Sequence, residues 1–240
     1  MESSNFINDK YYLKSSVMFF KSNFKKRSQF VKKKKFLFHE ISNFLNNCID
    51  HTKNIFIFCA GNSILGKNID SKNIYIKEID EQYQINHKDN IHYIDENIEN
   101  ILSDCDTVVI SDLEHQSNPA KNLFNLSKII SDDTKIILLS KNMVWMILIK
   151  ILKFFFNFSP KKNNFLPSSY LDNLYSSCNL ELIREEKIIA LPIYIPFLTN
   201  ILNRIFRLPL LNIFCMSNNS ILKKKTKKLS NNKNLKISFI

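Results

Sequence analysis

Ile55-Phe56-Ile57-Phe58-Cys59 is an unbroken apolar run that leads directly into Ala60-Gly61-Asn62-Ser63. A short run without polar alternation is typical of a strand that is buried on both faces, as in a parallel sheet. Gly61 is one of only two glycines in the chain, and glycine supplies the backbone conformations that tight turns need. The stretch therefore predicts a buried strand that ends in a turn.

Further short apolar runs follow, and helical patterns separate several of them. Leu123, Leu126 and Ile130 mark an amphipathic helix between residues 120 and 130. A longer helix is expected at 143–156, and another begins at Pro167. The other predicted strands are Asn73–Ile79, Ile91–Ile94, Thr107–Ile110, Lys135–Leu139 and Leu180–Leu191. Strands alternating with helices predict an α/β fold, a doubly wound, mostly parallel Rossmann-like sheet with helices on both faces.

Composition and length predict one globular domain with additions at its ends. The chain has 240 residues, of which 45% are hydrophobic, and it is long enough to bury a sizeable core. We expect an N-terminal helical segment over residues 1–50 and the α/β domain over 51–222, with a helical insertion near 195–210. Residues 223–240 form a basic tail.

The net charge of +12 is concentrated at the two ends, and residues 221–240 carry seven lysines and no acid. Two interpretations stay open: attraction to phosphates or an anionic membrane surface, and a general compositional bias. No aromatic RNA-binding signature accompanies the lysines, so nucleic acid is an unlikely partner. The five cysteines lack CxxC spacing, and no metal site is expected. Because the sequence shows no signal-peptide pattern, we predict a cytoplasmic protein. A peripheral position at the inner membrane face is the second interpretation.

Polar and acidic residues gather where the predicted strands end. In doubly wound sheets, ligands bind beyond the carboxyl ends of the strands, at the point where the strand order reverses. Gly61 also fits an ordinary turn, and Asp112 also fits a helix cap. The candidate ligand-binding residues are Cys59, Gly61 and Ser63 after the first strand, Glu78 after the second, Asp95 after the third, and Ser111 and Asp112 after the fourth.

The first strand and turn resemble the first motif of class I S-adenosylmethionine-dependent methyltransferases. That motif reads hydrophobic–hydrophobic–acidic–hydrophobic–Gly–x–Gly–x–Gly. Ile57 stands at its acidic position, and Cys59, Gly61 and Ser63 stand at its three glycine positions. The resemblance implies S-adenosylmethionine as the cofactor, held by this loop.

Later positions extend the resemblance. Glu78, seventeen residues after Gly61, matches the acidic residue that hydrogen-bonds the cofactor ribose in this family. Asp95 matches an acidic residue near the adenine. The segment 106–112, which includes Ser111 and Asp112, matches the border of the methyl-donor and substrate region.

The second half of the chain resembles a bacterial subgroup of these methyltransferases, which is sometimes fused to glycosyltransferase domains. The resemblance implies a small-molecule substrate, such as a sugar or a lipid-linked glycan intermediate, and a glycosyltransferase as a partner. The motifs that carry it, in order, are Asn142-Met143-Val144-Trp145, Asn164-Phe165-Leu166, Leu191-Pro192, Ile195-Pro196, Asn203-Arg204 and Leu208-Pro209-Leu210.

Methyl transfer from a sulfonium needs mainly an aligned nucleophile, and a general base is added when the acceptor is a hydroxyl. His115 is the candidate base, although an exposed loop histidine is the simpler interpretation. The replaced glycines and Ile57 support an alternative, a catalytically inactive methyltransferase-like binding or scaffolding protein. A dinucleotide oxidoreductase is disfavoured because the chain lacks GxGxxG.

Overall fold

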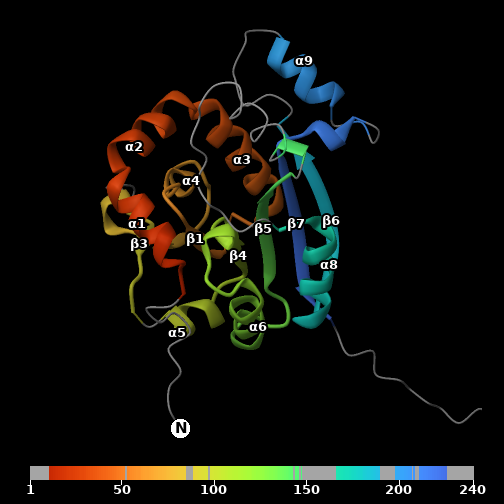
Figure 1. Cartoon of the computed structure of the whole chain (residues 1–240). Coiled ribbons are helices and arrows are strands. Elements are labelled where there is room, and N and C mark those ends of the chain that lie inside the picture. Colours follow the sequence, from red (N-terminus) through yellow and green to blue (C-terminus); the bar gives the residue numbers. More distant parts are fainter. Residues whose placement is uncertain are drawn as a thin grey trace, which may run out of the picture.

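Seven strands form one sheet in the part of the chain that the computed structural model describes (Figure 1). The described residues are 11–51, 53–84, 89–96, 98–142, 144–145, 147, 166–189, 198–206, 208 and 211–225. The strands are β1 (Asn54–Cys59), β2 (Asn73–Glu78), β3 (Ile91–Tyr93), β4 (Thr107–Ile110), β5 (Lys135–Lys141), β6 (Leu180–Ile188) and β7 (Ser217–Lys224).

The sheet has the strand order β3-β2-β1-β4-β5-β7-β6. β1 pairs in parallel with both β2 and β4, so the order reverses between β1 and β4. β7 is antiparallel to its two neighbours, β5 and β6. The predicted doubly wound, mostly parallel sheet is therefore confirmed, and its topological switch point lies at the carboxyl ends of β1 and β4.

The helices follow the amphipathic patterns of the sequence. The helix predicted from 120 to 130 is α6, while the helix expected at 143–156 lies almost entirely outside the described residues. No helix in the described part of the chain is long and apolar enough to cross a membrane. The α-helices are α1 (Lys14–Ser22), α2 (Phe24–Lys33), α3 (Lys35–Cys48), α4 (Ile64–Lys67), α5 (Ile98–Ser103), α6 (Pro119–Ile129), α8 (Ser168–Ser177) and α9 (Leu198–Ile205). The 3-10 helices are η1 (Glu81–Tyr83), η2 (Leu113–His115) and η3 (Asn212–Phe214).

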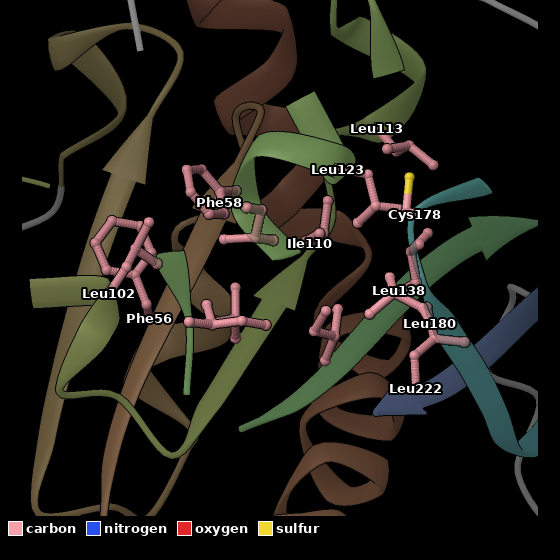
Figure 2. Close-up of a cluster of buried hydrophobic side chains, with 14 of the residues drawn as sticks. Phe56, Phe58, Leu102, Ile110, Leu113, Leu123, Leu138, Cys178, Leu180 and Leu222 are labelled. Atoms are coloured by element: carbon pink, nitrogen blue, oxygen red, sulfur yellow. The ribbon is translucent and has the colours of Figure 1, made fainter. Parts of the chain in front are cut away.

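Alternate residues of β1 divide the core into two layers. Phe56 and Phe58 are fully buried against the helices α5, α6 and α8, in the cluster that Figure 2 draws. Ile55 and Ile57 are fully buried on the opposite face, where α3 packs. Each face of a central strand is thus covered, which explains why the sequence of β1 shows no polar alternation.

β7 was not among the predicted strands. It continues to Lys224, so the first two residues of the basic tail expected from 223 belong to the sheet. The strand is buried along Ser217–Leu222, yet four of these six residues are polar, and this pattern does not signal a buried strand. Some of its polar groups find partners on neighbouring elements: Tyr175 Oη donates to Ser220 Oγ at 3.1 Å, and Asn218 Nδ2 donates to Glu185 Oε1.

The N-terminus of α6 has a side-chain cap that can be tested. Asn118 Oδ1 accepts the backbone N–H of Lys121 at 3.0 Å, and Pro119 occupies the first helical turn. Asn118→Ala is expected to lower the free energy of unfolding by about 1 kcal/mol, measured by urea denaturation. Lys121→Ala keeps the backbone donor and serves as the control, with an expected change below about 0.5 kcal/mol. Equal losses in both variants would contradict the assigned cap.

Candidate functional site

The turn after β1 is held by the acid at the end of β2. The Gly61 N–H donates to Glu78 Oε1 at 2.6 Å, and the Ile79 N–H donates to the same oxygen at 2.9 Å. The Glu78 side chain is buried, and its second oxygen, Oε2, has no hydrogen-bond partner among the described residues. A buried polar atom without a partner is uncommon and calls for an explanation, such as a missing ligand.

Burial raises the pKa of Glu78 from 4.5 to about 7, and the charge of Asp112 acts in the same direction. The backbone N–H groups of Gly61 and Ile79, and more weakly that of Ser63, oppose this rise because they stabilise the ionised form. The carboxyl therefore titrates near neutral pH. A carboxyl group with a shifted pKa at the carboxyl ends of the strands of an α/β sheet is a candidate for ligand binding or catalysis.

Asp112 lies past the end of β4, at the other side of the switch point. The carboxylate is fully buried and accepts hydrogen bonds from Tyr12 Oη at 2.8 Å and from Gln116 Nε2 at 2.9 Å. Burial raises its pKa to about 6, and these two donors lower it in part. Asp112 precedes η2, but its side chain does not cap that helix. Its carboxylate instead connects β4 to the N-terminal segment.

Ser111 joins the ends of β1 and β4. Its hydroxyl donates to the Phe58 carbonyl at 2.7 Å and accepts from Asn62 Nδ2 at 3.2 Å. Asn62 Oδ1 in turn accepts the Ala60 N–H at 3.0 Å. The polar side chains at the switch point therefore brace the turn that carries Gly61.

The two residues that stand at glycine positions of the motif, Cys59 and Ser63, cause no backbone strain. Gly61 has φ +69°, a left-handed conformation that favours glycine. The loop therefore retains glycine at the position that requires it. Ser63 has φ −54°, which any residue adopts, and its hydroxyl donates to the Tyr83 carbonyl at 2.6 Å. Cys59 is the last residue of β1 and is fully buried. Ile57 faces the α3 side of the core, away from the polar contacts of the loop.

Asp95 lies two residues beyond β3 and is solvent-exposed. Its carboxylate forms an ion pair with Lys77 Nζ at 2.6 Å, and more than half of the side chain faces water. Lys77 directly precedes Glu78 on β2. Asp95 thus lies at the carboxyl end of the sheet with the other candidates, but with its charge paired to the neighbouring strand.

The residue that sequence reasoning missed is Phe20 of α1. A Cβ atom added to Gly61 would lie 2.6 Å from Phe20 Cε1, so the phenyl ring occupies the space directly over the turn. Tyr83 Oη donates to the Phe20 carbonyl at 2.8 Å and fixes the helix there. Arg27 of α2 adds a hydrogen bond of 3.4 Å from Nε to the Gly61 carbonyl. No spacing rule connects a phenylalanine to a turn 41 positions later, so the sequence offered no signal.

His115 is buried, which corrects the simpler expectation of an exposed loop histidine. The ring is 8% exposed and meets Phe20 edge to face, with 5.3 Å between ring centroids. Phe20 therefore separates Gly61 from His115. The structure brings Gly61, Glu78 and Asp112 together at the carboxyl ends of the strands, with the ring of Phe20 packed over Gly61.

No family model matches this sequence, and no curated protein matches it either. Solved structures do match. An S-adenosylmethionine-dependent methyltransferase from Thermotoga maritima is 10% identical with a TM-score of 0.61; the match covers 88% of this chain and 100% of that one. Magnesium protoporphyrin IX methyltransferase from Synechocystis, solved with S-adenosylhomocysteine, is 12% identical with a TM-score of 0.54, over 87% of this chain and 97% of that one.

A third similar chain comes from the complex between the Trm112 methyltransferase activator of Haloferax volcanii and a methyltransferase, with 9% identity and a TM-score of 0.61. The match covers 86% of this chain and 96% of that one. Identities this low establish shared architecture, and function has to be argued from the site. This chain has the Rossmann-like fold of S-adenosylmethionine-dependent methyltransferases.

Proposed function

We propose that this chain is an S-adenosylmethionine-dependent methyltransferase that acts on a small molecule, with the nucleoside bound at the carboxyl ends of β1 and β2. The observation that carries the proposal is Glu78. Its Oε1 atom holds the Gly61 turn, and its buried Oε2 atom has no hydrogen-bond partner in the part of the chain that the structure describes. A ribose hydroxyl is a donor of the kind that this oxygen lacks, as in other nucleoside sites at this position of α/β sheets.

The residues present fit the cofactor at Glu78 and require one movement at Gly61. The positive φ of Gly61 keeps the backbone free of a side chain where the ligand approaches. Phe20 fills that space in the structure. Binding therefore requires the ring to leave, and the cost of that displacement lowers the apparent affinity.

S-adenosylmethionine supplies, when bound, a methyl group on a positively charged sulfonium. The buried carboxyls of Glu78 and Asp112 favour a cation at this end of the sheet once they are ionised. His115 is the candidate to take the proton of an acceptor hydroxyl, to which the cofactor, when bound, would supply its methyl group. We propose a sugar or lipid-linked glycan intermediate as the acceptor, and a glycosyltransferase as the partner that works on the same glycan.

The alternative is a non-catalytic binding or scaffolding protein that keeps the sheet without its cofactor. The observation in its favour is Phe20, because a fully packed ring over Gly61 is a stable way to close an unused site. The two functions differ in one property that is directly measurable, the binding of S-adenosylmethionine or S-adenosylhomocysteine.

Calorimetric titration with both ligands tests the proposal. We expect binding to the unmodified chain and about 10- to 100-fold weaker binding to Glu78→Gln, because the ribose loses a hydrogen bond to a charged acceptor. The matched control is Glu81→Gln, which removes an exposed acid three residues away. Binding to neither ligand at any concentration, also in the Phe20→Ala variant, would exclude the enzyme and leave the scaffold. Equal affinity of Glu78→Gln and the unmodified chain would exclude this site.

A further inference from the structure

A cleft lies between α4 and the two helices α2 and α3. Its volume is about 520 Å³, and small-molecule sites in proteins have volumes of about 300–1,000 Å³. Figure 1 shows α4 enclosed by the arc that α2 and α3 form. Four of the side chains that line the cleft are apolar and at least half-buried: Val31, Phe36, Phe38 and Ile64. The cleft therefore offers a ligand an apolar surface outside the site at Gly61 and Glu78.

The charged side chains that line the same cleft are all lysines. They are Lys32 of α2, Lys35 of α3 and Lys67 of α4, and all three are exposed. None of them forms an ion pair with any residue in the described part of the chain. His39, one turn after Lys35 on α3, also lines the cleft and offers an N–H donor in either tautomer. Cations from three helices thus surround one apolar hollow.

The acids that follow these residues in the sequence lie outside the cleft. Glu40 comes directly after His39, but it lines a separate hollow beside Arg184. Asp70 follows α4, and its Oδ2 atom lies 3.9 Å from His51 Nδ1. Ammonium groups that share a cleft without an acid repel one another, so the binding of an anion between them is favoured.

Apolar walls and a rim of lysines together suit an anionic amphiphile. A phosphate monoester carries a charge of about −1.5 to −2 at pH 7 and three acceptor oxygens, which several ammonium groups can contact at once. A free phosphate would leave the apolar walls without a partner, and a neutral chain would leave the lysines without one. The flat surface of a bilayer does not reach Phe38, which is 4% exposed. A single hydrocarbon chain can enter the cleft.

We propose that the cleft binds a phosphate monoester that carries a single hydrocarbon chain. Lys35 and Lys67 hold the phosphate from two helices, and the chain lies over Phe36 and Ile64. This inference goes beyond the proposed methyl transfer and does not depend on it, because the residues that line the cleft do not include those of the candidate site.

Calorimetric titration of the full chain with octyl phosphate, below the concentration at which it forms micelles, tests the cleft. Butyl phosphate, inorganic phosphate and 1-octanol are each expected to bind at least about tenfold more weakly, because each lacks part of the chain or the charged head. The double variant Lys35→Gln/Lys67→Gln is expected to weaken the binding of octyl phosphate at least about tenfold, because two charged donors are lost. Both lysines are exposed, so the fold is retained.

The matched control is Lys25→Gln/Lys26→Gln, which removes the same charge from exposed positions of α2 that do not line the cleft. This variant should bind octyl phosphate as the unmodified chain does. Equal losses of affinity in the two double variants would overturn the proposal, because the chain would then attract anions without a defined site. So would equal affinities for octyl phosphate and inorganic phosphate, or no measurable binding of octyl phosphate. Titration with S-adenosylhomocysteine is a separate measurement, so either proposal can fail without the other.

Discussion

Phe20→Ala is expected to raise the affinity for S-adenosylhomocysteine by about 10- to 100-fold. In the unmodified chain, part of the binding free energy is spent on displacing the ring that lies over Gly61. Removing the ring beforehand eliminates that cost. The same change lowers the free energy of unfolding by about 3–5 kcal/mol, because Phe20 is 2% exposed and its removal leaves a cavity.

A variant of similar instability separates the two effects. Phe44→Ala removes a ring of α3 that is 6% exposed and belongs to the core layer under α3, not to the cluster that contains Phe20. It should lose comparable stability without any gain in affinity. Phe20→Leu, a smaller change, covers the case in which the alanine variant does not fold and should show an intermediate gain. Affinities of the Phe20 variants equal to that of Phe44→Ala would show that the ring does not control access.

The free energy of unfolding is expected to fall as the pH rises from about 4.5 to about 7, with Glu78 as a principal cause. Burial raises the pKa of this carboxyl in the folded protein to about 7. The folded state therefore binds the proton more tightly than the unfolded chain, and the stabilisation is complete below pH 4.5. This stabilisation, on the order of 3 kcal/mol, is lost by pH 7.

Urea denaturation across this pH range measures the slope. Glu78→Gln keeps the shape of the side chain but does not titrate, so the slope should become shallower. A slope with the same sign persists from Asp112, whose pKa is also raised by burial, to about 6. Asp95→Asn removes an exposed acid at the same end of the sheet and is the control. Identical slopes for Glu78→Gln and the unmodified chain would contradict the raised pKa of Glu78.

The central sheet could be read from the sequence because its strands are short and apolar. The predicted strands Ile55–Cys59 and Thr107–Ile110 match β1 and β4 to within one residue. Their burial on both faces leaves an uninterrupted apolar signal. β7 could not be found in this way, because its buried positions include the polar residues Asn218 and Asn219, which break the apolar signal.

The candidate site was predictable to the extent that it depends on strand ends. Gly61 and Glu78 were expected to border one ligand site, because the carboxyl ends of adjacent parallel strands lie at the same end of the sheet. Their direct hydrogen bond was not predicted. The position of Phe20 over Gly61 and the burial of His115 were not predictable, because both result from the packing of α1 over the carboxyl end of β1. Periodicity assigns a helix and its apolar side, but not the distant residue that this side covers.

A crystal structure of the Phe20→Ala variant with S-adenosylhomocysteine tests the central claim most directly. We predict a ribose hydroxyl within about 2.5–3.0 Å of Glu78 Oε2, with the ligand seated over the Gly61 turn. A ligand bound elsewhere on the protein, with Glu78 Oε2 still lacking a partner, would contradict it.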